Sequence, residues 1–94
     1  MKQFMILHYG FRPPTPEEMD AWHRWFDLVA GRQVDRGGLR GGREILPTET
    51  RELPFAADSI TGYTIIQAES LDEAEEIARQ CPIVASTRVY EIAR

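Results

Sequence analysis

Hydrophobic positions along this chain follow two periodicities, and the first third shows both. The run from Phe4 to Tyr9 is apolar at nearly every position, which predicts a strand covered on both faces. After a turn over residues 10–14, the run Thr15-Pro16-Glu17-Glu18 supplies an N-cap, a proline at the first helical position and a capping-box glutamate. A helix is predicted from here to Gly31, which is expected to end it. Apolar residues recur at helical spacing at Met19, Trp22, Phe26 and Val29, with Trp25 beside them.

The middle of the chain is less regular. Residues 33–46 are mixed and rich in glycine, which predicts an irregular strand with bulges at Gly37-Gly38 and Gly41-Gly42. Residues 47–61 are expected to form a loop or a short hairpin.

The last third predicts a strand, a helix and a further strand. Residues 62–68 form the first of these strands, and Ser70 with Glu73 predicts a second capping box. The buried stripe of this helix is expected at Leu71, Ala74, Ile77 and Ala78. Cys81-Pro82 marks the end of the helix, and residues 87–92 form the last strand.

The order strand-helix-strand-strand-helix-strand predicts a ferredoxin-like α+β fold with a four-stranded antiparallel sheet, in a single domain over residues 1–94. Phe4 and Ile6 point to one face of this sheet, while Met5 and Leu7 point to the other. Two helices can cover only one face, and the other would expose an apolar patch that soluble monomers rarely tolerate. A second copy pairing sheet to sheet is expected to cover it, so a homodimer is predicted.

Composition and charge narrow the class of partner. The 94 residues suit one domain, and a net charge of −4 disfavours nucleic acid or an anionic membrane as a general partner. No run reaches the ~18 apolar residues of a membrane span, and the N-terminal run lacks a small-residue cleavage site. The single cysteine fits a reducing compartment, so a cytoplasmic location is expected. No spacing of His, Cys or Glu resembles a metal site, and neither a metal nor a cofactor is expected.

Several motifs, taken in order, resemble those of one family. They are Met5-Ile6-Leu7, the Thr-Pro-Glu-Glu helix start with Trp22 and Trp25, Gly62-Tyr63-Thr64-Ile65-Ile66, Glu69-Ser70-Leu71-Asp72-Glu73-Ala74, Cys81-Pro82 and Val89-Tyr90-Glu91-Ile92. This set is similar to the YCII-related (DGPF-type) family of dimeric α+β barrels. Of the namesake Asp-Gly-Pro-Phe, the stretch Glu52-Leu53-Pro54-Phe55 keeps only the Pro-Phe. The resemblance implies subunits paired through their sheets and a cleft between the first helix and the sheet.

The resemblance also implies where chemistry would take place. Some relatives are lyase- or dehydrochlorinase-like, and their suspected machinery is a His on the first helix with an Asp in a Gln-Asp-Pro turn after the second. The His corresponds to His23, a suitable general base because histidine titrates near neutrality. The Asp corresponds to position 81, where this chain has Cys81, so Asp35 is a candidate substitute. A structural interpretation also stays open, in which His23 pairs with Asp27 or Asp20.

Two further side chains have alternative interpretations. Cys81 could be a nucleophile with His23 as its base, but a helix C-terminus disfavours a thiolate, and packing is favoured. His8 shares a face with Phe4 and Ile6 and could point into a pocket or into a dimer interface, of which the interface is favoured. The candidate ligand-binding residues are His8, Trp22, Phe26, Arg43 and Tyr63.

The segment from Arg36 to Arg43 contains two Arg-Gly-Gly units. An RNA-binding role would need more copies and interleaved aromatic residues, and a phosphate loop would need a Gly-Lys-Ser/Thr sequence before a helix start. The arginines of this flank, Arg32, Arg36, Arg40 and Arg43, could instead attract a carboxylate ligand. A solvated strand edge is the favoured interpretation.

Two functions follow from these observations. The favoured one is a homodimeric protein that binds a small molecule between the first helix and the sheet, or acts as an accessory module, because the relatives' acid is missing at position 81. The alternative is a small cofactor-free enzyme that uses His23 for proton transfer of the lyase, isomerase or dehalogenation type.

Overall fold

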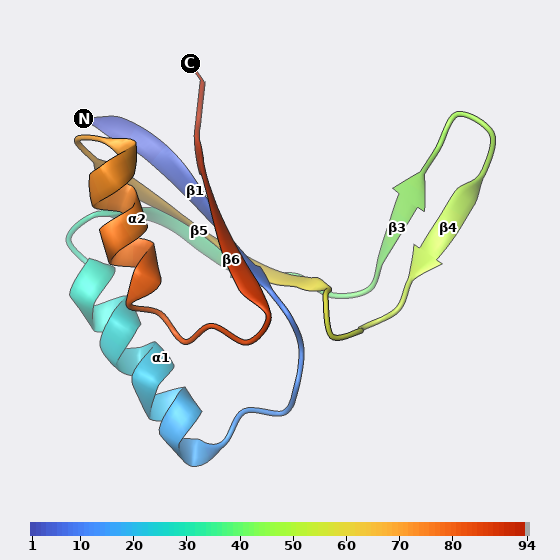
Figure 1. The fold of residues 1–94 in the computed structure, drawn as a ribbon, viewed down its shortest axis with the longest axis horizontal. Coiled ribbons are helices and arrows are strands. Elements are labelled where there is room, and N and C mark those ends of the chain that lie inside the picture. The colour runs from blue at the N-terminus through green and yellow to red at the C-terminus, as the bar shows by residue number, and fades with distance from the viewer. Residues whose placement is uncertain (94) are drawn as a thin grey trace.

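The computed structural model describes residues 1–93, which form two helices and six strands. In chain order the elements are β1 (Lys2–Tyr9), α1 (Pro16–Val29), β2 (Gln33–Gly38), β3 (Gly42–Ile45), β4 (Thr50–Leu53), β5 (Ile60–Ala68), α2 (Leu71–Arg79) and β6 (Ser86–Glu91). Four strands form an antiparallel sheet in the order β2-β5-β1-β6, and both helices pack on one of its faces (Figure 1). The ferredoxin-like arrangement is confirmed, with a hairpin inserted between β2 and β5. Within this part of the chain, neither helix has the length and apolar character that a membrane crossing needs.

The hydrophobic core lies between the sheet and the helices. On β1, the side chains of Phe4, Ile6 and His8 are buried, while those between them are only half-buried. The neighbouring strand β5 shows the same alternation and buries Thr64 and Ile66. The helices complete this core with Trp25, Val29, Ala74 and Ala78. Strand alternation therefore places every second side chain of the central strands toward the helices.

The other face of the sheet has no helix over it. Its apolar side chains include Met5, Leu7 and Ile65, which are half-buried, and Tyr90 of β6, which is 51% exposed. Met5 is in register with both Ile65 and Tyr90, so these residues form a continuous surface across three strands. We call the surface formed by these four residues the open face.

The start of α1 is formed as predicted. Thr15 Oγ1 accepts a hydrogen bond from the Glu18 N–H (3.2 Å), and the Glu18 carboxylate accepts one from the Thr15 N–H (3.3 Å). The helix also ends as predicted, just before Gly31, because Val29 is its last residue and Ala30 is its C-cap. Gly31 does not adopt a left-handed conformation; among the described residues, only Gly10 has a positive φ, of 106°.

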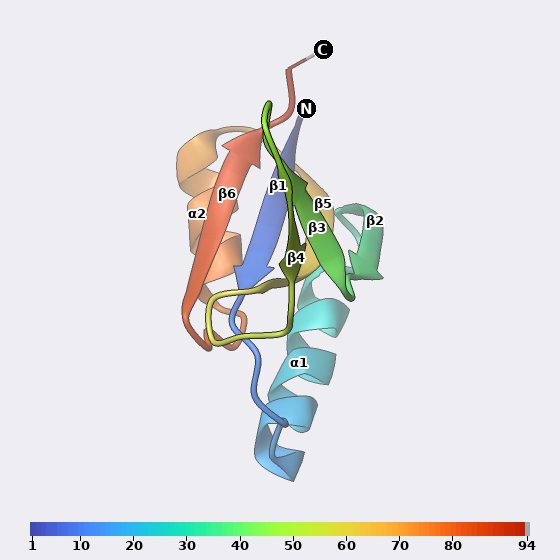
Figure 2. The same cartoon turned by 90° about the vertical axis from the view of Figure 1, so that its right-hand side faces the viewer.

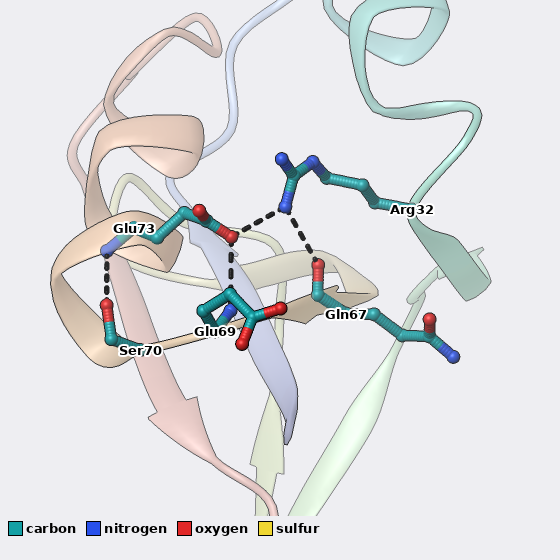
Figure 3. A network of polar contacts seen from close by, with 5 residues as sticks. All are labelled: Arg32, Gln67, Glu69, Ser70 and Glu73. Atoms are coloured by element: carbon teal, nitrogen blue, oxygen red, sulfur yellow. Dashed lines mark hydrogen bonds and ion pairs between the residues drawn. The ribbon is translucent and has the colours of Figure 1, made fainter. Parts of the chain in front are cut away.

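The start of α2 differs from the predicted capping box. Ser70 Oγ accepts from the Glu73 N–H (3.2 Å), but the Glu73 carboxylate accepts from the Glu69 N–H (3.1 Å) and from Arg32 (2.6 Å). Arg32 also reaches the Gln67 carbonyl oxygen at 3.5 Å, so the residue that precedes β2 is tied to the start of α2 (Figure 3). The Glu69 hydrogen bond, followed by the Arg32 contact, lowers the pKa of Glu73.

The predicted second strand is wrong in its extent. It forms two strands in different sheets, because β2 pairs with β5 while β3 pairs with β4. No bulge occurs at Gly37 and Gly38; the register of β2 shifts earlier, between Gln33 and Asp35. Gly37 has a packing reason instead, because a Cβ there would lie 2.7 Å from Cε1 of the Tyr63 ring.

The inserted hairpin β3–β4 projects away from the sheet and the helices (Figures 1 and 2), and both of its strands are exposed throughout. Its second strand lies in the segment that was expected to be a loop or a short hairpin. Cross-strand ion pairs link Arg43 to Glu52 (3.0 Å) and Arg51 to Glu44 (3.9 Å). Such exposed pairs are each worth little, so the hairpin adds little to the stability of the core.

Candidate functional site

A pocket of about 540 Å³ lies between α1 and the sheet. It is bordered by the end of β1 and the loop that follows, by α1, and by the facing ends of β2 and β5. Its apolar wall is formed by Phe11, Met19, Trp22 and Phe26. Of the residues singled out from the sequence, His8, Trp22, His23, Phe26 and Tyr63 border this pocket, whereas Asp35 and Arg43 do not.

His8 brings the imidazole to the bottom of the pocket. It is buried, with 8% of its surface exposed, because it continues the inward-facing positions of β1. Its Nε2 lies 3.0 Å from Thr64 Oγ1 on the neighbouring strand, and its ring meets Trp22 and Trp25 edge-on at centroid distances of 5.0 and 5.6 Å. Two indoles and one hydroxyl group therefore hold this ring in place.

Burial lowers the pKa of His8 to about 4. The physical cause is desolvation, which penalises the charged imidazolium. The tryptophan rings that surround the imidazole carry no negative charge that would offset this penalty. His8 is consequently neutral near pH 7, with one ring nitrogen as a donor and the other as an acceptor. It can orient a ligand or a hydroxyl group, and it is a weak base.

Cys81 lies behind His8. Its Sγ is 4.0 Å from His8 Nδ1 and 3.9 Å from Thr87 Oγ1, and the residue is 5% exposed. Burial raises the pKa of this thiol, so it is protonated near neutrality, and only the thiolate is a strong nucleophile. These observations support the packing interpretation of Cys81. They also show that Cys81, at the position where the resemblance implies an acid, faces the histidine of β1.

His23 has a different environment from His8. It is an exposed residue of α1 at the border of the pocket. In the part of the chain that the structure describes, no hydrogen bond or ion pair joins it to Asp20 or Asp27. It is accessible to a ligand, but no carboxylate orients it.

Asp35 and Tyr63 contact one another. The Tyr63 hydroxyl group donates to Asp35 Oδ2 at 3.1 Å, and this hydrogen bond to the carboxylate raises the pKa of the tyrosine. Successive side chains of a strand alternate between faces, and Thr64, the neighbour of Tyr63, points into the core. Asp35 is therefore occupied on the face opposite His8.

The arginines of the glycine-rich segment separate in space. Arg43 lies on the projecting hairpin, where it pairs with Glu52. Arg36 borders the pocket instead, with its guanidinium carbon 4.1 Å from the centroid of the Phe26 ring. In the sequence, Arg36 is only one of four arginines on this flank. Two features of the sequence bear on the position of Arg36: the place of Phe26 on the helix and the alternation of side chains around Asp35. Neither feature shows that Arg36 reaches Phe26, because that contact depends on the pairing of β2 with β5.

No metal centre is evident among residues 1–93, because no group of three or more His, Cys, Asp or Glu side chains could hold an ion. The polar groups that border the pocket include the neutral imidazole of His8, the His23 ring, hydroxyl groups, the ion pair of Arg12 with Glu18 and the guanidinium of Arg36. Such a set can bind and orient a small organic molecule.

Comparisons with known proteins agree with this architecture. A model of the YCII-related domain family matches residues 29–94. No curated protein sequence matches the chain significantly. Among solved structures, the chain is similar to 5-chloro-2-hydroxyhydroquinone dehydrochlorinase from Burkholderia phenoliruptrix AC1100 in complex with 2,5-dihydroxybenzoquinone. The TM-score is 0.63 and the identity 18%, over 97% of this chain and 93% of that one. At this identity the likeness shows the fold.

Proposed function

This chain belongs to the YCII-related domain family, and from that premise we propose that its pocket beside α1 binds a small molecule. The observation that carries the proposal is the composition of the pocket, in which an aromatic wall faces a few converging polar groups, among them His8, Thr64 and Arg36. A volume of about 540 Å³ falls within the roughly 300–1,000 Å³ of small-molecule sites. The structural neighbour, which holds 2,5-dihydroxybenzoquinone, supports the same function.

Cofactor-free proton transfer of the lyase, isomerase or dehalogenation type is the second candidate. It is supported by the neighbour, a dehydrochlorinase, and by His23 at the border of the pocket. The missing acid weighs against it: position 81 carries a buried thiol, and the Asp35 carboxylate accepts from Tyr63. A catalytic histidine usually depends on a carboxylate that orients its ring and stabilises its charged form. We therefore favour ligand binding over catalysis as the function of the pocket.

We also propose that two copies pair through the open face. Its apolar side chains continue across three strands without a helix above them. Exposed apolar surfaces of this kind are typical of interaction sites, and a twofold arrangement covers both copies with the same surface. The resemblance to dimeric α+β barrels supports this pairing.

The binding proposal is tested by calorimetry and thermal shift with a panel of small phenols, quinones, carboxylates and neutral aromatic compounds. We expect at least one compound to bind and to raise the melting temperature. Met19→Trp should abolish this binding, because it places an indole in the pocket wall. Leu28→Trp is the matched control, since Leu28 lies on the same helix, is 54% exposed and does not border the pocket. Equal binding by both variants, or no binding by the wild type, would contradict the proposal.

The same panel tests catalysis when the products are followed by mass spectrometry. The enzyme candidate predicts turnover that falls at least about 100-fold in His23→Gln, since general acid–base catalysis contributes roughly 10²–10⁴-fold. Ligand binding should be retained in this variant. Binding without turnover would favour the first candidate and reject the second for the compounds tested.

A further inference from the structure

Arg36 supplies a positive charge that the protein itself does not neutralise. The other arginine of the pocket, Arg12, forms an ion pair with Glu18 at 2.7 Å. Within residues 1–93, no carboxylate lies in ion-pair distance of the Arg36 guanidinium, whose contact is the face of the Phe26 ring. The histidine at the bottom of the pocket is neutral near pH 7 because burial lowers its pKa. Among the arginines and carboxylates that border the pocket, Arg36 is therefore the one whose charge is not neutralised by an ion pair.

The nearest acid in the sequence is already bound elsewhere. Asp35 Oδ1 accepts from the backbone N–H of Arg36 at 2.8 Å, and Oδ2 accepts from the Tyr63 hydroxyl group at 3.1 Å. Residues 35 and 36 also point to opposite faces of β2. The guanidinium thus keeps its N–H donors for a group that enters the pocket.

Flat aromatic surfaces stand beside this charge. The rings of Trp22 and Phe26 are nearly parallel, with an interplanar angle of 26° and centroids 5.7 Å apart. Phe11, which also borders the pocket, stacks on Phe55 at 28° and 5.0 Å. Surfaces of this kind favour a planar ring, because aromatic groups pack best in offset-stacked or edge-to-face geometry.

We propose that the pocket selects a single-ring aromatic carboxylate, with its ring against Trp22 and Phe26 and its carboxylate on Arg36. This inference rests on the proposed binding function and names its ligand class. A guanidinium matches a planar carboxylate through two parallel N–H···O bonds, whereas a ligand cation would be repelled. The pocket volume of about 540 Å³ accommodates one such ring with its substituents.

The experiment compares 4-hydroxybenzoate with 4-hydroxybenzamide by isothermal titration calorimetry. The two probes share size and ring but differ in charge. We expect the wild type to prefer the carboxylate by at least about tenfold, since hydrogen bonds to charged groups are each worth more than a factor of ten. Arg36→Gln should remove this preference by weakening the binding of the carboxylate much more than that of the amide, and Arg36→Lys should keep part of it.

Arg40→Gln is the matched control, because it makes the same change in net charge at an exposed residue that does not border the pocket. It should retain the wild-type preference. Equal affinity of the wild type for both probes, or a preference that survives in Arg36→Gln, overturns the inference while the binding function stands. If other classes of compound bind but neither probe does, the inference is again overturned. If no compound of the whole panel binds, the proposed function itself fails.

Discussion

At the residue scale, His8 illustrates how strand alternation sets the chemical state of a side chain. Phe4 and Ile6 precede it on the same face of β1, and both are completely buried. The imidazole follows them under the helix, where its partners are a threonine, a thiol and two indoles. Because none of these groups is charged, desolvation dominates and the pKa falls to about 4.

This pKa predicts a pH dependence of stability. Unfolded His8 takes up a proton near pH 6.5, whereas folded His8 takes one up only near pH 4. Between these values the unfolded chain binds the additional proton, so the free energy of unfolding decreases as the pH falls. The loss reaches at most about 3 kcal/mol at pH 4, and above pH 6.5 this group contributes no further change.

The measurement is urea unfolding, followed by tryptophan fluorescence, at several pH values from 4 to 7. His8→Gln cannot titrate, so its free energy of unfolding should decrease less than that of the wild type over this range. The comparison between the two proteins cancels the titration of the carboxylates they share. Parallel curves for the two proteins would show that His8 is not desolvated in the folded state.

At the element scale, the start of α1 joins local folding to the pocket. Glu18 accepts from the Thr15 backbone in the capping box, pairs with Arg12 and also borders the pocket. Arg12 and Thr15 together lower the pKa of Glu18, so its carboxylate is charged near neutrality. The capping-box residue Glu18 therefore also neutralises the charge of Arg12, one of the two arginines that border the pocket.

The capping residue allows a prediction at this scale. Thr15→Ala removes the oxygen that accepts from the Glu18 N–H, and such substitutions usually cost about 1 kcal/mol. We expect the free energy of unfolding to fall by that amount in urea titrations. Thr48→Ala, in the exposed turn of the hairpin, makes the same chemical change without a cap and should stay within about 0.5 kcal/mol of the wild type. Equal losses in the two variants would exclude the capping explanation.

At the scale of the whole molecule, the fold is asymmetric. The helices cover one face of the sheet, and the hairpin projects away from it (Figure 1), so that it lies in front of the strands when seen from its own side (Figure 2). The apolar side chains of the open face have no helix over them, and the edge strands of the sheet are β2 and β6. A molecule built in this way can bury more apolar surface only by pairing with another.

The pairing prediction concerns mass in solution. Analytical ultracentrifugation of the wild type at micromolar concentration should give twice the 10.8 kDa of one chain. Ile65→Glu, on the open face, should shift the population to single chains, because the charge would be buried without a partner. Leu28→Glu, on the exposed side of α1, should keep the wild-type mass. A wild type that sediments as a single chain would refute the pairing.

Local patterns were sufficient to predict most of the fold. Examples are the capping sequence at Thr15, the alternation of Phe4 with Met5 and the order of strands and helices. Each of these patterns can be recognised from residues that are close together in the sequence. Periodicity and capping are encoded at that range. The hairpin was missed in part because its strands are short and fully exposed, so no apolar pattern separates them from a loop.

The site needed the tertiary structure. Arg36 and Arg43 are seven positions apart in one glycine-rich run, yet one meets Phe26 and the other pairs with Glu52 on the hairpin. Asp35 differs from Arg36 by a single position and points to the other face.

By itself, the sequence determined the family, most of the elements and the two-faced strands of this protein, because each of these is written in short-range patterns. The tertiary structure decided which charge enters the pocket, which histidine is buried and neutral, and which carboxylate is already occupied. These outcomes depend on contacts such as that between His8 and Thr64, 56 positions apart. Spacing along a chain does not specify such contacts; strand pairing and helix packing do.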